Sequence, residues 1–380
     1  MKRGITRLLS FAAGPLCVLA LAAPAGAASG PSAGPIKPTR PAWDTWTAPA
    51  THKLPPSALA GFFNSNGGTG SSYNSSGGSV VWSSSGVGLN HLVFTGLGGI
   101  TGGNVEVSSE SEDTCTVDGW GPSSGNLTVD VYCYSYAGVL QNADFSVTVT
   151  QPTSPPHGAL AYDWIASKAK SYSLSGQYQY NSANHANSVT HLGIGQYKIN
   201  MPGVGTLGTS GTVKVSAYNT GAGDCQLKSW GGTSTGEAIF VNCYSATGTP
   251  QNRQFVVSYA RGNNVMGQDS LTDANALADQ PASSAYIPHT QFDSHAGATV
   301  SMSQFEEPHV WLVIFAAVGG HPSNTNGGAG NVQVTPQNGS YTHCFMFESS
   351  SGFSPEAAVA CLNNSGHIVS SKYTVQWAVS

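Results

Sequence analysis

Residues 225–243, CQLKSWGGTSTGEAIFVNC, contain the pattern that decides the fold: two cysteines enclosing two apolar segments and a glycine-rich turn. Pairs with nearly the same separation occur twice more, at Cys115/Cys133 and at Cys344/Cys361. A Gly-x-Val-x-Val element precedes each pair, at 103–107, 211–215 and 330–334. The pattern indicates a unit of about a hundred residues that is used three times.

Apolar and polar residues alternate within each unit, which is the mark of a half-buried β-strand. In the first unit the alternating positions are Val105 and Val107, then Leu127, Val129 and Val131, then Phe145, Val147 and Val149. Turns rich in Gly, Ser and Asn separate such segments. We therefore predict an all-β fold of three tandem antiparallel β-sandwich-like (or partly open barrel) repeats of roughly 110 residues, with one disulfide inside each repeat.

Domain boundaries follow from composition. Residues 1–27 have the basic start, apolar stretch and Ala25-Gly26-Ala27 site of a secretory signal peptide, and 28–41 form a Pro-rich spacer. We place the first repeat at 42–153, the second at 154–264 and a divergent third at 265–380. The predicted localisation is secreted and extracellular.

Removal of the signal peptide takes Cys17 and leaves six cysteines, for which fifteen pairings exist. Because each repeat carries two, we predict the pairs Cys115–Cys133, Cys225–Cys243 and Cys344–Cys361. The alternative, a zinc site, normally uses a closer cysteine spacing. Disulfides are also expected in an oxidising compartment.

Charged residues make up only 9% of the chain and the formal net charge is −5. The sequence shows no basic run, so we do not expect nucleic acid as a partner. The longest apolar run after the signal peptide, residues 310–320, is too short to span a bilayer, so we expect no membrane insertion. The sequence also lacks a nucleophile elbow, a P-loop and a His-Glu-x-x-His motif, and we predict no cofactor.

One resemblance rests on the second repeat: YKINMPG at 197–203, GTVKVSAY at 211–218, then Cys225, Trp230-Gly231 and VNCY at 241–244, and FVVSY at 255–259. This pattern resembles a repeat of secreted proteins from actinomycetes and other soil bacteria whose function is uncharacterised. The resemblance covers the mature chain, most closely in the second repeat, and it implies no catalytic residues.

Aromatic residues are the main binding candidates, because an apolar ring can stack on the hydrocarbon face of a sugar. Tyr132, Tyr134 and Tyr136 alternate around Cys133 and could form an exposed tyrosine ladder, with Trp120 and Trp230 in nearby turns. The alternative is structural, since tyrosine has a high β propensity and stabilises sheets through cross-strand pairs.

Histidines gather in the third repeat, where His309 lies close to Glu306 and Glu307. These three are weak candidates for a metal site, and scattered surface histidines are the alternative.

The leading hypothesis is a non-catalytic secreted protein whose partner is unknown, an extracellular glycan, a cell-wall polymer or a protein. Tandem repetition fits this hypothesis because linked modules gain avidity. The alternatives are a secreted hydrolase with a His/Glu-based site in the third repeat, and a structural protein of the envelope or spore surface.

Overall fold

The computed structural model describes residues 58–65, 71–174, 176–267, 272–295, 297–318, 330–350 and 354–379. These residues belong to one compact unit, and their regular elements are all β-strands, which confirms the predicted all-β class. The predicted signal peptide and spacer lie outside the described residues. The described part of the chain contains no helix with the length and hydrophobicity that a membrane crossing would need.

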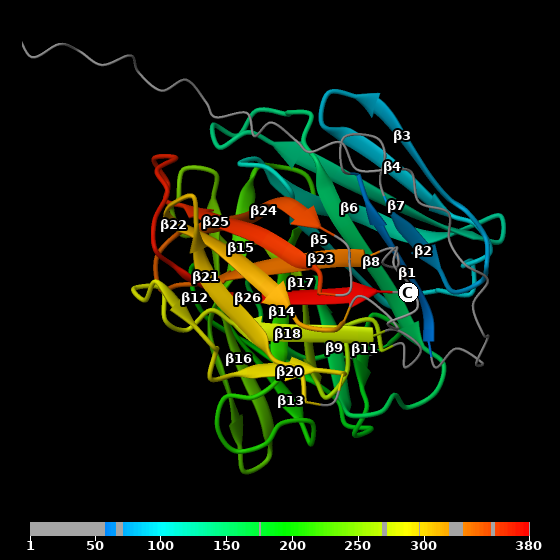
Figure 1. Cartoon of the computed structure of the whole chain (residues 1–380). Coiled ribbons are helices and arrows are strands. Elements are labelled where there is room, and N and C mark those ends of the chain that lie inside the picture. Colours follow the sequence, from blue (N-terminus) through cyan, green and yellow to red (C-terminus); the bar gives the residue numbers. More distant parts are fainter. Residues whose placement is uncertain are drawn as a thin grey trace, which may run out of the picture. The chain divides into compact units, whose positions relative to one another are not determined.

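The strands form four sheets (Figure 1). The first sheet has the order β2 (Ser72–Asn74), β1 (Ala58–Asn64), β8 (Phe145–Pro152) and β5 (Asn104–Ser109). The second has the order β11 (Gln179–Asn181), β9 (Ala159–Ile165), β17 (Gln254–Arg261), β14 (Thr212–Tyr218), β6 (Thr114–Ser123), β7 (Asn126–Tyr134), β4 (Leu89–Phe94) and β3 (Val80–Gly86).

The third sheet has the order β10 (Tyr172–Ser173), β12 (Ser188–Gly193), β13 (Gln196–Pro202), β16 (Gly236–Ser245), β15 (Gly223–Thr233), β23 (Gly330–Gln337), β26 (Lys372–Val379), β18 (Thr272–Leu277) and β20 (Gln291–Asp293). The fourth has the order β19 (Ala285–Tyr286), β21 (Val300–Phe305), β22 (Glu307–Phe315), β25 (Glu356–Leu362) and β24 (His343–Ser350). Among the described strands, each sheet runs from one edge strand to another without closing on itself.

Three stretches of chain each supply most of one large hydrophobic cluster, and we call them the first segment (58–152), the second segment (159–261) and the third segment (272–379). The first cluster combines side chains of the first and second sheets, the second cluster those of the second and third, and the third cluster those of the third and fourth. Because the second and third sheets each contain strands of two segments, neighbouring segments share a sheet. A parallel β-bridge connects the two segments within each shared sheet: Tyr218 with Val117 in the second sheet, and Leu227 with Gln337 in the third.

A disulfide-linked hairpin lies in each segment, formed by β6–β7, β15–β16 and β24–β25. The linked cysteines are direct cross-strand partners, and they are the three predicted pairs. Each hairpin has a register shift shortly after its first cysteine. Strand alternation directs Leu127, Val129 and Val131 into the core, where all three are fully buried.

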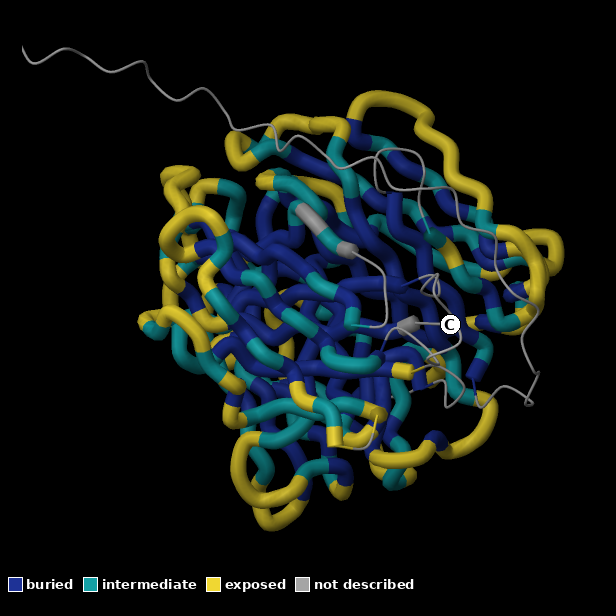
Figure 2. The backbone as a smooth tube through the Cα atoms, in the orientation of Figure 1, coloured by how far each residue is buried: buried dark blue, intermediate teal, exposed yellow. Residues whose placement is uncertain are grey.

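The central strands β5, β14 and β23, which carry the three Val-x-Val patterns, contact one another in pairs (Figure 1). Their polar residues are as buried as their valines: Glu106, Lys214 and Gln333 are 0%, 4% and 3% exposed. Figure 2 shows mainly buried backbone around these strands and exposed residues mostly in the outer loops. The polar face of each central strand is therefore an internal contact surface.

Candidate ligand-binding pocket

A cavity of about 230 Å³ lies where the second and third segments meet. One wall is the turn between β12 and β13 with the end of β16, and the other is the loop after β23. Its lining residues are Ile194, Gly195, Gln196, Asn242, Cys243, Tyr244, Gly248, Pro250, Gly339, Ser340 and Tyr341. Pockets for drug-sized ligands usually enclose about 300–1,000 Å³, so this cavity suits a smaller molecule.

Two tyrosines and an asparagine connect the two walls. The Tyr244 hydroxyl donates a hydrogen bond to the carbonyl oxygen of Gly339 at 3.1 Å, and the Asn242 amide donates to the Tyr244 oxygen at 3.2 Å. The rings of Tyr244 and Tyr341 meet edge to face with centroids 5.6 Å apart. Such aromatic pairs favour a fixed orientation, so the two rings form a defined corner of the pocket.

Backbone hydrogen bonds hold the outer wall. Gly195 has a φ of +69°, and its N–H donates to the side-chain oxygen of Asn252 at 2.7 Å. Its carbonyl oxygen accepts the N–H of Cys243 at 2.7 Å. The turn is thereby tied to the disulfide strand, and Ile194 at its tip is 66% exposed beside the pocket.

Tyr341 also connects the pocket to a polar cluster at the centre of the molecule. Burial raises the pKa of Tyr341, as does the nearby carboxylate of Asp224, while a hydrogen bond with Thr114 and the charge of Arg253 oppose the rise. Asp224 in turn lies 3.2 Å from Nδ1 of the buried His343. Tyr341 of the third segment therefore contacts residues of the other two.

The pocket lining is neutral. Burial raises the pKa of Tyr244, which a hydrogen bond with Asn242 partly offsets, so both phenols keep their protons at physiological pH. The residues that line this cavity include no acid, base or histidine. Phenol, amide and backbone groups can exchange hydrogen bonds with a polar uncharged ligand.

The predicted tyrosine ladder is wrong. Tyr134 is only 6% exposed, and its hydroxyl oxygen accepts the N–H of Gly221 in the second segment at 2.8 Å. The strand ends at Tyr134, so the alternation does not continue to Tyr136, which is 63% exposed in the following turn. Tyr132 is half-buried, with its hydroxyl beside the carboxylate of Asp118. The three residues thus have three different environments.

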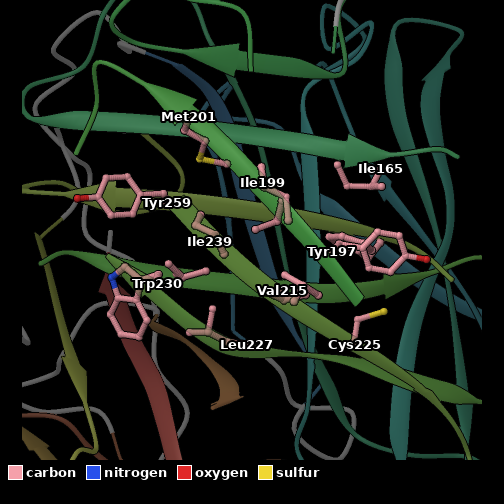
Figure 3. Packing of buried hydrophobic residues seen from close by; sticks show 14 of the residues in the cluster. Ile165, Tyr197, Ile199, Met201, Val215, Cys225, Leu227, Trp230, Ile239 and Tyr259 are labelled. Atoms are coloured by element: carbon pink, nitrogen blue, oxygen red, sulfur yellow. The ribbon is translucent and has the colours of Figure 1, made fainter. Parts of the chain in front are cut away.

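The two candidate tryptophans serve as packing residues. Trp230 is 5% exposed, and Figure 3 shows it among the residues of the second cluster, which include Leu227 and Ile239. Its indole N–H donates to the Ser210 carbonyl at 3.1 Å. Trp120 makes the equivalent bond to the Gly102 carbonyl at 2.7 Å. In Trp230 the ring is therefore packed in the core and the N–H is engaged within the protein.

Trp120 is half-buried where the first two segments meet. Its ring has edge contacts with three aromatic side chains of the second segment, Trp164, Tyr178 and Tyr218. Edge contacts on several sides reduce the ring area that remains for a ligand. We therefore assign Trp120 a packing role in the interface between the first and second segments.

The weak metal candidates do not form a metal site. Glu306, Glu307 and His309 are exposed around the turn between β21 and β22, and His309 Nδ1 lies 2.6 Å from the Ser370 hydroxyl. Within the described ranges, no group of three or more His, Cys, Asp or Glu side chains is placed to hold a metal ion. Glu306 and His309 both have a positive φ, at +51° and +72°, so the tight turn determines their positions.

Sequence reasoning missed the pocket itself. Tyr244, which lines the cavity, follows Cys243 as the predicted Tyr134 follows Cys133. Tyr341 lies in a loop without a strand pattern, and no signal in the sequence brings it to Tyr244. Comparison with known proteins gives no further guide, because no family model, curated protein or solved structure matches the chain.

Proposed function

We propose that the chain is a secreted, non-catalytic binding protein that holds one sugar unit of an extracellular glycan in the pocket between its second and third segments. The observation that carries this proposal is the cavity of about 230 Å³ with two tyrosines and neutral amides in its lining. Aromatic rings pack against the C–H face of a sugar, while amide and phenol groups bind its hydroxyls.

We also propose that the chain consists of three β-sandwich repeats. Each segment corresponds to one repeat, a two-sheet sandwich around its own hydrophobic cluster and its own disulfide. The corresponding positions of the three cysteine hairpins and the three central strands support this assignment. Three disulfides also indicate an oxidising, extracellular-type environment, which agrees with secretion.

Binding can be tested with the full mature chain on insoluble chitin, cellulose and peptidoglycan, and by calorimetry with N-acetylglucosamine and glucose. Asn242→Ala and Tyr341→Ala should weaken retention at least ten-fold, because each removes a polar or aromatic group of the pocket. Tyr136→Ala is the matched control, since this exposed tyrosine is not part of the lining. Retention that depends on Tyr136 and not on Tyr341, or the absence of any retention, would refute the proposal.

A further inference from the structure

The central strands of the three segments exchange hydrogen bonds in a closed cycle. The hydroxyl of Ser216 accepts the N–H of Val107 at 3.0 Å, that of Thr335 accepts the N–H of Val215 at 3.1 Å, and that of Ser108 accepts the N–H of Val334 at 2.9 Å. Each hydroxyl residue directly follows the second valine of its own Val-x-Val pattern. The second segment thus binds the first, the third binds the second, and the first binds the third.

From this cycle we propose that the polar faces of β5, β14 and β23 form three specific protein–protein interfaces. The chain is then a tethered heterotrimer, whose segments recognise one another even when the linkers between them are cut. The proposal concerns assembly and does not depend on what the pocket binds.

The interface between the first and third segments is the main evidence. No linker joins these two segments directly, since the whole second segment lies between them in sequence. Side chains of the first segment nevertheless donate to carbonyl oxygens of the third: Ser108 to Val334 at 3.1 Å, Ser146 to Val332 at 2.7 Å and Ser71 to Gly330 at 2.8 Å. In the other direction, the Gln333 amide donates to the Ser146 hydroxyl at 2.9 Å. Non-covalent contacts therefore hold this interface together, without a linker that directly connects the two segments.

Three different residues occupy the middle position of the three Val-x-Val patterns. We infer that this difference determines which segment occupies which place around the central contacts. Glu106, Lys214 and Gln333 are all buried among the central strands. Lys214 Nζ donates to the Ser108 hydroxyl and to the Val334 carbonyl, so it reaches both other segments. Burial raises the pKa of Glu106 to about 7 and lowers that of Lys214 to about 8, and the opposite charge of each group works against the shift of the other.

Three copies of the first segment around the same contacts would bury three carboxylates together, and three copies of the second would bury three ammonium groups. Burying like charges without partners is strongly unfavourable. The pattern Glu, Lys, Gln therefore favours one copy of each segment and disfavours identical copies, a specificity that depends on repulsion as well as attraction.

The test is to cut the tether in the folded protein. A protease recognition sequence is inserted between Ser154 and Pro155, both exposed in the linker after β8, and the purified full chain is nicked there. Because every disulfide lies within one segment, non-reducing denaturing gels should separate the two pieces. In native buffer the pieces should remain one particle by size exclusion and native mass spectrometry. Dissociation at micromolar concentration without denaturant would overturn the proposal.

Specificity is tested in the nicked protein with Glu106→Gln and Lys214→Met, alone and together. Either single change leaves one buried charge without the opposite charge that compensates it and should weaken association at least ten-fold, whereas the double variant should recover most of the loss. Glu112→Gln is the control, because this exposed glutamate lies in the same segment. Circular dichroism of each variant before nicking shows whether it folds. Equal association of the single and double variants would contradict order specificity by charge.

Discussion

Ser216 and Val107 are joined by two hydrogen bonds although they belong to different segments: the Val107 N–H donates to the Ser216 hydroxyl at 3.0 Å, and that hydroxyl donates to the Val107 carbonyl oxygen at 3.0 Å. Both residues are buried, at 3% and 4% exposure. One short side chain thus satisfies the donor and the acceptor of a neighbouring strand, a pairing that β5 would otherwise need from another strand.

Replacing Ser216 with alanine should therefore cost about 1–3 kcal/mol of unfolding free energy, because it leaves a buried N–H and a buried carbonyl without a partner. Urea denaturation of the full mature chain measures this change. Thr247→Ala is the matched control: this exposed hydroxyl contacts only neighbouring turn residues, and its loss should change stability by less than about 0.5 kcal/mol. Equal effects of the two substitutions would show that the central contacts add nothing to stability.

The central strands show what the sequence could and could not predict. The alternation of Val105 and Val107 correctly indicates a strand with one face in a hydrophobic core. The other face carries Glu106 and Ser108, and alternation alone does not tell whether water or protein covers it. Here the covering groups come from residues more than a hundred positions away, such as Lys214. Contacts of this kind leave no local pattern.

For the candidate site, too, the sequence predicts contacts within one repeat and does not predict contacts between segments. The cysteine pairs were predictable because both members lie within one repeated pattern. Tyr134 and Trp230 are buried because loops and strands outside the local pattern cover them, which the sequence pattern does not indicate. The pocket corner formed by Tyr244 and Tyr341 combines residues of two segments, so neither segment predicts it alone.

Removal of the Cys225–Cys243 disulfide by double alanine substitution should lower the unfolding free energy by about 3 kcal/mol, as expected for a closed loop of this length. It should also weaken ligand retention, because Cys243 lines the pocket. The double substitution of Cys115 and Cys133 is the control: it should lower stability by a similar amount and leave the pocket intact. Thermal melts and the glycan retention assay measure the two effects. Equal retention by the two double variants would contradict a role of Cys243 in the pocket.

Gly195→Ala should destabilise the protein by more than about 2 kcal/mol, because an added Cβ would lie 2.4 Å from the Cys243 carbonyl oxygen at a φ of +69°. Two residues earlier, at the end of β12, Gly193 has no atom within 4 Å of an added Cβ. Gly193→Ala is therefore the matched control and should be nearly neutral. The two urea midpoints, compared at equal m values, test the geometry of the pocket wall, and equal midpoints would contradict it.

The stability of the chain should fall as the pH rises from about 4.5 to about 8, and Glu237 should account for part of this slope. Burial raises the pKa of Glu237 from 4.5 to about 8, against the opposing hydrogen bonds of Gly231, Tyr259 and Ala238 and the charge of Arg261. The folded state therefore keeps the proton that the unfolded state loses above pH 4.5. This contribution is fully present below pH 4.5, declines between the two pKa values, and is absent above pH 8.

Glu237→Gln keeps the shape of the side chain without a titrating proton, so it should flatten the decline by on the order of a few kcal/mol between pH 5 and 8. Asp273, whose pKa burial and the charge of Asp293 raise to about 7, should maintain a smaller slope in this variant. Urea titrations at several pH values measure both slopes, with Glu112→Gln as the exposed control. A slope unchanged by Glu237→Gln would mean that Glu237 is ionised in the folded protein, with Arg261 as the nearby positive charge.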